Sequence, residues 1–207
     1  NNRIDPSQVP NTPILTRAEI DPDGDGNAYL NDYESFMANA HLEFRPNDRT
    51  DAVISGGINS GGGLINQAQG PGYAQGLDFW TQARIKSGGF FGQISYSGND
   101  GGSDDSPFYL YLTAQRILTK RSSLDAQFQY NFDVENFLDS NFTFGADFRD
   151  IQSESENTLF GQYDGSNDYN NYGIYGQGTS RFGDKLDLTY ALRYDKLNFI
   201  DKGKIAP

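Results

Sequence analysis

Residues 124–132 read LDAQFQYNF, and this stretch decides the fold class. Its even-numbered positions hold Leu, Ala, Phe, Tyr and Phe, whereas its odd-numbered positions hold Asp, Gln, Gln and Asn. Side chains of a β-strand point alternately to its two faces, so this strict alternation predicts a strand with one apolar and one polar face.

Seven further segments show the same period of two, at residues 36–45, 52–59, 77–85, 90–97, 142–149, 172–179 and 186–195. The segment at 172–179 is rich in glycine, so its alternation is weaker. Residues 1–32 contain four prolines and no sustained period. The pattern therefore predicts an extended loop region at 1–32, followed by β-barrel strands over 33–207.

The connections between these segments alternate in length. Short polar connections are expected at 45–50, 86–89, 136–140 and 181–184, and long ones at 60–75, 98–122, 151–171 and after 196. Short turns on one side and long loops on the other are typical of outer-membrane barrels. We therefore expect an all-β fold, an antiparallel up-and-down transmembrane β-barrel segment of about eight strands.

One stretch with strand-like composition, residues 108–112, does not fit this scheme. A further crossing strand there would place 151–171 on the side of the short turns. We interpret it as extended structure within the long-loop region.

A soluble β-sandwich would show the same alternation, because it also buries one face and exposes the other. Two features favour a membrane barrel. The long loops all fall on one side, and aromatic residues gather beside the short turns, as in an interfacial girdle. These residues are Phe44, Phe90, Phe132, Phe142 and Phe182. A membrane barrel also requires Phe128 and Leu188 to point away from its axis, and Gln129 to point inward.

The composition excludes several classes of protein. The 207 residues include no Cys and a single His, which rules out disulfides, thiolate zinc sites and Cys-His catalysis. No apolar run approaches the roughly 18 residues of a membrane-spanning helix. A formal net charge of −12 argues against nucleic acid and anionic surfaces as partners. The 13 Tyr and 15 Phe argue against simple disorder.

Five stretches carry a family resemblance, at residues 33–50, 52–57, 83–93, 124–132 and 172–195, the last reading YGIYGQGTSRFGDKLDLTYALRYD. They resemble the barrel of TonB-dependent outer-membrane receptors, in particular the SusC-like receptors of Bacteroidetes-type bacteria. The resemblance covers most of residues 30–207 and rests on the order of strands and turns.

The resemblance implies a barrel of 22 strands around an N-terminal plug that imports a nutrient, with energy supplied from the inner membrane through TonB. It also implies outer-membrane lipids, the TonB complex and a surface lipoprotein as partners, with the long loops outside the cell. This sequence shows no plug, TonB box or terminal aromatic residue. We therefore expect an internal piece of such a receptor.

The sharpest local motif is residues 21–32, DPDGDGNAYLND. Acidic residues at positions one, three and five, a glycine at six and an acid at twelve match a calcium-binding loop. The predicted Ca²⁺ ligands are Asp21, Asp23, Asp25, Asn27 and Asp32. Asp32 replaces the usual Glu and is shorter, so bidentate closure is in question. A solvated Asp/Gly turn is the alternative interpretation.

Other polar residues are assigned mainly structural roles. A lumen network of mixed charge is predicted from Asp125, Asp147, Arg149, Asp187 and Arg193. His41 is predicted to form hydrogen bonds in the lumen, and Trp80, on a polar face, to stack on a sugar or pack on a plug. Loop carboxylates are predicted to be solvated, namely Asp100, Asp104, Asp105, Asp164 and Asp168.

The sequence thus predicts a non-enzymatic part of a nutrient receptor in the bacterial outer membrane, taking up a glycan, a peptide or a metal chelate. A calcium-stabilised structural or adhesive surface protein is the alternative. A small-barrel enzyme comes third, because no catalytic constellation stands out.

Overall fold

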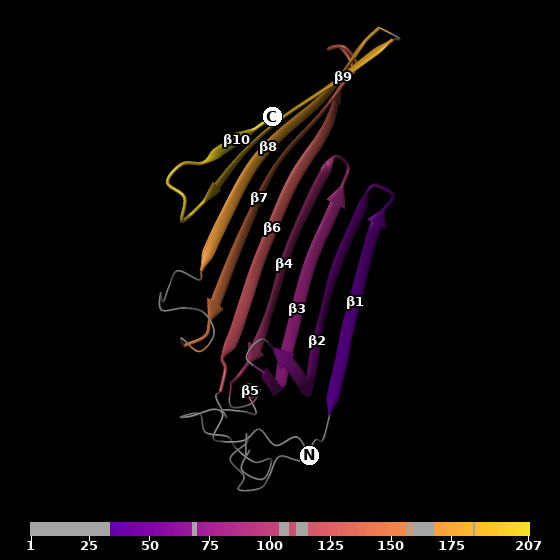
Figure 1. Cartoon of the computed structure of the whole chain (residues 1–207). Helices are drawn as coiled ribbons and strands as arrows, with labels where there is room; N and C mark the ends of the chain where they lie inside the picture. Colours follow the sequence, from indigo (N-terminus) through magenta and orange to yellow (C-terminus); the bar gives the residue numbers. More distant parts are fainter. Residues whose placement is uncertain are drawn as a thin grey trace, which may run out of the picture.

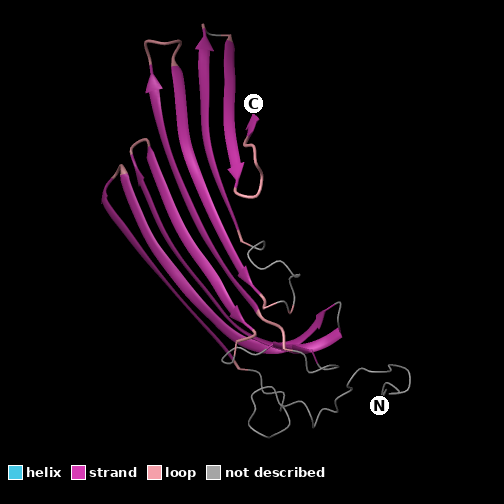
Figure 2. Cartoon of the chain, turned by 90° about the vertical axis from the view of Figure 1, so that its left-hand side faces the viewer, coloured by secondary structure: helices cyan, strands magenta, loops and turns pink. Residues whose placement is uncertain are grey.

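The computed structural model describes residues 34–67, 70–103, 108–110, 116–156, 158, 168–183 and 185–207. They form one ten-stranded antiparallel sheet, which is not closed into a barrel. Figure 2 shows the sheet as a single curved layer. The strands are β1 (Ser35–Asn47), β2 (Thr50–Gln67), β3 (Gly70–Ser87), β4 (Phe90–Gly101), β5 (Phe108–Leu110), β6 (Thr119–Val134), β7 (Ser140–Glu154), β8 (Tyr169–Phe182), β9 (Leu186–Leu197) and β10 (Lys204–Ala206). Among the described residues, no helix is long and apolar enough to span a membrane.

The chain runs up and down through the sheet in the order β1-β2-β3-β4-β6-β7-β8-β9-β10. The connections β1–β2, β3–β4, β6–β7 and β8–β9 lie at the same end, the upper end in Figure 1. We call this the turn end, and the opposite end the loop end. β5 pairs with β3 beside the main path. The interpretation of residues 108–112 as extended structure outside the crossing strands is therefore confirmed for β5.

Two predicted connections were wrong. Residues 60–75 are not a long loop, because β2 and β3 stay paired up to Gln67 and Gly70. Glycines at 61–63 interrupt the alternation of side chains without interrupting the backbone ladder. The segment after 196 is not a long connection either, because β10 turns back and pairs with β9. The sheet therefore has eight long strands, as expected, and two short ones.

The register brings most apolar side chains of the long strands onto one face, which we call the apolar face. A row across the sheet contains no charged residue and consists of Phe44, Ala52, Ile85, Gly92, Phe128, Ala146, Ile174, Tyr194 and Ile205. Large side chains of this row are not covered by other parts of the protein: Phe128 is 52% and Ile174 59% exposed. The sheet alone therefore leaves a broad apolar surface that needs a nonpolar environment.

The predicted aromatic residues beside the short turns do share this face. Phe132 packs on Phe142 and Phe144, with ring centroids 5.8 and 6.1 Å apart. Phe142 also meets Tyr190 edge to face at 6.4 Å. These contacts form an aromatic band near the turn end of β6, β7 and β9, the position expected of an interfacial girdle.

A small buried cluster lies at the loop end. Phe108, Leu110 and Ile117 form it, and Ile65 and Ala74 pack against it. Its strand residues come from β5 and from the far ends of β2 and β3. The cluster holds the extended β2–β3 hairpin and β5 together and leaves the middle of the sheet as a single layer.

Several strand glycines lie directly opposite an aromatic residue of the neighbouring strand. Trp80 is the register partner of Gly57, and Tyr175 that of Gly145. A Cβ added at Gly57 would lie 2.7 Å from Trp80 Nε1, and one added at Gly145 would lie 2.2 Å from Tyr175 Cζ. Each ring therefore occupies the space that a side chain at the glycine would take. We call these the ring-glycine pairs.

A first prediction concerns the tight β3–β4 turn. Gly88 has a φ of 56°, and a Cβ added at Gly89 would lie 1.9 Å from the backbone oxygen of Asn131. The amide of Asn131 donates to the Gly89 carbonyl at 2.8 Å, so β6 cannot move away without losing this bond. We expect Gly89→Ala to lower the free energy of unfolding by about 1–2 kcal/mol.

Urea unfolding in detergent micelles measures this change. Gly63→Ala is the matched control, because an added Cβ there meets nothing within 4 Å, and we expect a change below about 0.5 kcal/mol. Equal unfolding midpoints for the two variants would contradict the close approach of this turn to β6.

Candidate functional site

The polar side chains of the long strands share the opposite face, which we call the polar face. One row across it runs Glu43, Val53, Arg84, Gln93, Gln127, Asp147, Gly173 and Asp195. Asp125, Gln129, Asp187 and Arg193 lie on the same face. The predicted separation of these residues from Phe128 and Leu188 is therefore confirmed.

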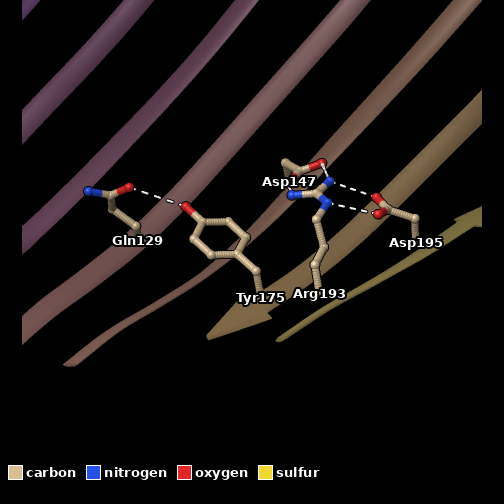
Figure 3. Close-up of polar contacts among 5 residues, drawn as sticks. All are labelled: Gln129, Asp147, Tyr175, Arg193 and Asp195. Carbon is tan, nitrogen blue, oxygen red and sulfur yellow. Dashed lines mark hydrogen bonds and ion pairs between the residues drawn. The ribbon is translucent and has the colours of Figure 1, made fainter. Parts of the chain in front are cut away.

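Arg193 is the centre of the best-connected group on the polar face (Figure 3). Its Nη1 and Nη2 donate to the two carboxylate oxygens of Asp147 at 2.8 and 2.9 Å. Its Nε and Nη2 donate to Asp195 at 2.8 and 2.6 Å. The guanidinium geometry matches two-pronged binding of carboxylates, and Arg193 uses it twice. This arrangement joins β7 to β9 across β8.

Glycine makes these crossings possible. A Cβ added at Gly173, on the intervening strand β8, would lie 2.4 Å from Arg193 Nη2. In the same way the Tyr175 side chain crosses β7 at Gly145 and donates its hydroxyl hydrogen to Gln129 Oε1 at 3.2 Å. Arg193 also lies over the Tyr175 ring, with its Cζ 5.7 Å from the ring centroid, which adds a cation-π contact.

The five residues of the predicted lumen network do form ion pairs, but in three separate groups. Arg149 pairs with Asp125, and Arg193 with Asp147. Asp187 pairs instead with Arg181 at 3.0 Å, near the β8–β9 turn. The predicted network lacks Asp195, although Asp195 lies two residues from Arg193 on the same face of β9, a spacing that indicates such a contact.

The turn end of β1–β3 carries a second charged group. Arg45 pairs with Glu43 and with Asp51, the latter at 3.0 Å. Arg84 Nη2 lies 3.9 Å from Asp51. Two arginines here meet two carboxylates, and in the other group Arg193 lies between two carboxylates, so both groups join different strands through ion pairs.

Farther toward the loop end of β1 and β3 lie the two other residues singled out from the sequence. His41 is opposite Ser55 on the polar face, and no hydrogen bond joins its imidazole to a described residue. Its predicted hydrogen-bonding role therefore stays a prediction. Trp80 lies on the polar face as expected and is 45% exposed.

The predicted calcium ligands, Asp21, Asp23, Asp25, Asn27 and Asp32, lie outside the described residues, as does the whole loop region 1–32. Within the described ranges, no group of three or more acidic or His side chains could hold a metal ion. Of the loop carboxylates, Asp100 lies 3.7 Å from Lys120 Nζ, and Asp168 accepts the Ser153 amide at 2.8 Å. Both therefore have partners and are not merely solvated. Asp104, Asp105 and Asp164 fall outside the described residues.

Comparison with known proteins agrees with this two-faced sheet. Residues 2–205 match a protein family described as "TonB dependent receptor-like, beta-barrel". Searches of curated proteins and of solved structures found no match. The family match gives no support to the alternative of a structural or adhesive surface protein.

Proposed function

The chain belongs to the family of TonB-dependent receptor β-barrels, and on this premise we propose that it forms part of the wall of a receptor that takes up a nutrient across the outer membrane. The observation that carries this proposal is the uncharged row on the apolar face, with Phe128 and Ile174 more than half exposed. A bilayer supplies the nonpolar environment that such a surface requires.

The strand lengths support the same proposal. A transmembrane β-strand needs about 9–11 residues at the usual tilt. β6 has 16 residues and β9 has 12, so each is long enough to cross with residues to spare. In this arrangement the polar face lines the lumen. Arg193, bound to Asp147 and Asp195, links β7 to β9 in the wall of the lumen.

We propose the partners and type of receptor from the sequence resemblance. The apolar face would contact outer-membrane lipids, and the whole receptor would receive energy through TonB and act with a surface lipoprotein, as SusC-like receptors do. The turn end would face the periplasm and the loop end the outside. The nutrient would be a glycan, a peptide or a metal chelate.

Membrane fractionation of cells that make the receptor tests its location. We expect the receptor to remain in the outer-membrane fraction after washes with salt and alkaline carbonate, and to be released by detergent. The physical reason is that the apolar face, once inserted, cannot be exposed to water without a large loss of free energy. Release by salt alone would contradict the proposal.

We also propose that residues 21–32 bind Ca²⁺ outside the cell, on the basis of ligand spacing alone. A site with a Kd of about 10⁻⁴–10⁻³ M would be occupied there. Calorimetric titration with calcium should give binding heat for the intact receptor, and a double variant, Asp23→Ala with Asp25→Ala, should abolish it. Equal heats for both proteins would leave only a solvated turn.

A further inference from the structure

The polar face carries an exposed aromatic residue that none of the ion-paired groups uses. Trp80 lies midway along β3, opposite Gly57 on β2 and Ser97 on β4. Its indole extends over the Gly57 backbone, since a Cβ at that glycine would lie 2.7 Å from Nε1 and 3.1 Å from Cε2. Almost half of the side chain remains exposed, so the ring forms a flat apolar platform on a polar wall.

The neighbours of Trp80 are neutral hydrogen-bonding side chains. The register places them in the same row or one position diagonal to it, and they are Asn39, Ser55, Asn59, Gln82, Ser95, Ser97 and Asn99. No Lys or Arg occupies a register, diagonal or same-strand position next to Trp80, and the one neighbouring carboxylate is Asp78. These surroundings suit an uncharged ligand and disfavour an anionic one.

Most of these neutral groups are also free of hydrogen bonds. Six of these seven side chains form no hydrogen bond with a described residue, and the seventh, Asn99, accepts the backbone amide of Arg121 through Oδ1 at 2.8 Å. On β6–β9, in contrast, Gln129 accepts from Tyr175, and Asn131 donates to Asn141 and Thr143. The polar face around Trp80 thus offers free amide and hydroxyl groups, whereas on β6–β9 such groups are occupied by hydrogen bonds to one another.

We propose that Trp80 and its ring of neutral side chains bind a neutral saccharide in the lumen. The C–H face of a sugar ring would stack on the exposed indole, and sugar hydroxyls would bond to the surrounding amides and hydroxyls. A few placed polar groups around an aromatic surface are typical of small-ligand sites. This inference rests on the proposed function and names the class of nutrient that the receptor takes.

The test uses the intact receptor in detergent micelles. Calorimetric titration is carried out with neutral oligomers of glucose, mannose and N-acetylglucosamine, and with uncharged peptides of similar mass. Trp80→Ala removes the platform, and Trp80→Phe keeps an aromatic surface. Phe91→Ala is the matched control, because Phe91 lies on the polar face of β4 about 20 Å along the strand from Ser97.

We expect at least one saccharide to bind, with affinity at least about tenfold weaker in Trp80→Ala, slightly weaker in Trp80→Phe and unchanged in Phe91→Ala. If Trp80→Ala does not fold, the double variant Asn39→Ala with Gln82→Ala replaces it and should weaken binding similarly. Absence of saccharide binding, equal affinity of wild type and variants, or Trp80-dependent binding of peptides alone would overturn the inference.

Fractionation separates this inference from the proposed function. A receptor that stays in the outer membrane and binds no saccharide through Trp80 retains the proposed function and loses the inference. A thermal stability that drops in Trp80→Ala with saccharide affinity unchanged would assign Trp80 to packing, for example against a plug, and would also overturn it. A receptor that is released by salt would overturn both.

Discussion

Phe128→Arg is expected to lower the free energy of unfolding from a bilayer by about 2–4 kcal/mol, which destabilises the folded protein. Phe128 lies in the uncharged row of the apolar face, away from the turn end, and is 52% exposed. An arginine there would place its guanidinium among lipid chains or force the strand to shift. Folding into phospholipid vesicles, followed by urea titration, measures the difference.

The matched control is the adjacent residue on the same strand. Gln127 lies on the polar face, opposite Gln93 and Asp147, so Gln127→Arg adds the same charge in the lumen and even beside a carboxylate. We expect a change below about 1 kcal/mol. Equal losses at the two positions would show that the apolar face does not contact lipid.

Arg193→Met should have the second largest effect, a loss of about 2–3 kcal/mol in the free energy of unfolding. The substitution keeps much of the side-chain length but removes all four hydrogen bonds to Asp147 and Asp195. Two carboxylates are then left close together without a counterion. Arg193 is 37% exposed, so water offsets part of the loss and the effect stays below that of a buried pair.

Urea unfolding in vesicles measures this loss, and a double-mutant cycle with Asp147→Asn isolates the Arg193–Asp147 term. Arg181→Met is the control, because the side chains of Arg181 and Asp187 are 58% and 59% exposed and such pairs contribute about 0–1 kcal/mol. If Arg193→Met costs no more than Arg181→Met, the cluster in Figure 3 does not brace the wall.

The two faces of the sheet could be predicted from sequence because they depend only on alternation within each strand. Residues 124–132 alone separate Phe128 from Gln129, and the structure keeps them apart. The far ends of β2 and β3 could not be predicted, because glycines at 61–63 have no side chains to alternate while their backbones still pair.

The contacts on the polar face could also be predicted only in part. The carboxylates near Arg149 and Arg193 could be expected on one face, but not which carboxylate each arginine binds, since that depends on register between strands. The Tyr175–Gln129 bond spans 46 residues and crosses β7 at Gly145. No spacing within a single strand indicates such a contact.

The ring-glycine pairs have a consequence for assembly. If one strand slipped by two residues against its neighbour, every apolar side chain would stay on the apolar face, so contact with lipid would not oppose the error. The rings would oppose it. After such a slip Trp80 would face Ser55 or Asn59, and Tyr175 would face Thr143 or Asp147, where side chains already fill the space over the backbone. Each ring-glycine pair therefore favours the correct register of its two strands, which burial of apolar side chains alone does not distinguish from a slip of two residues.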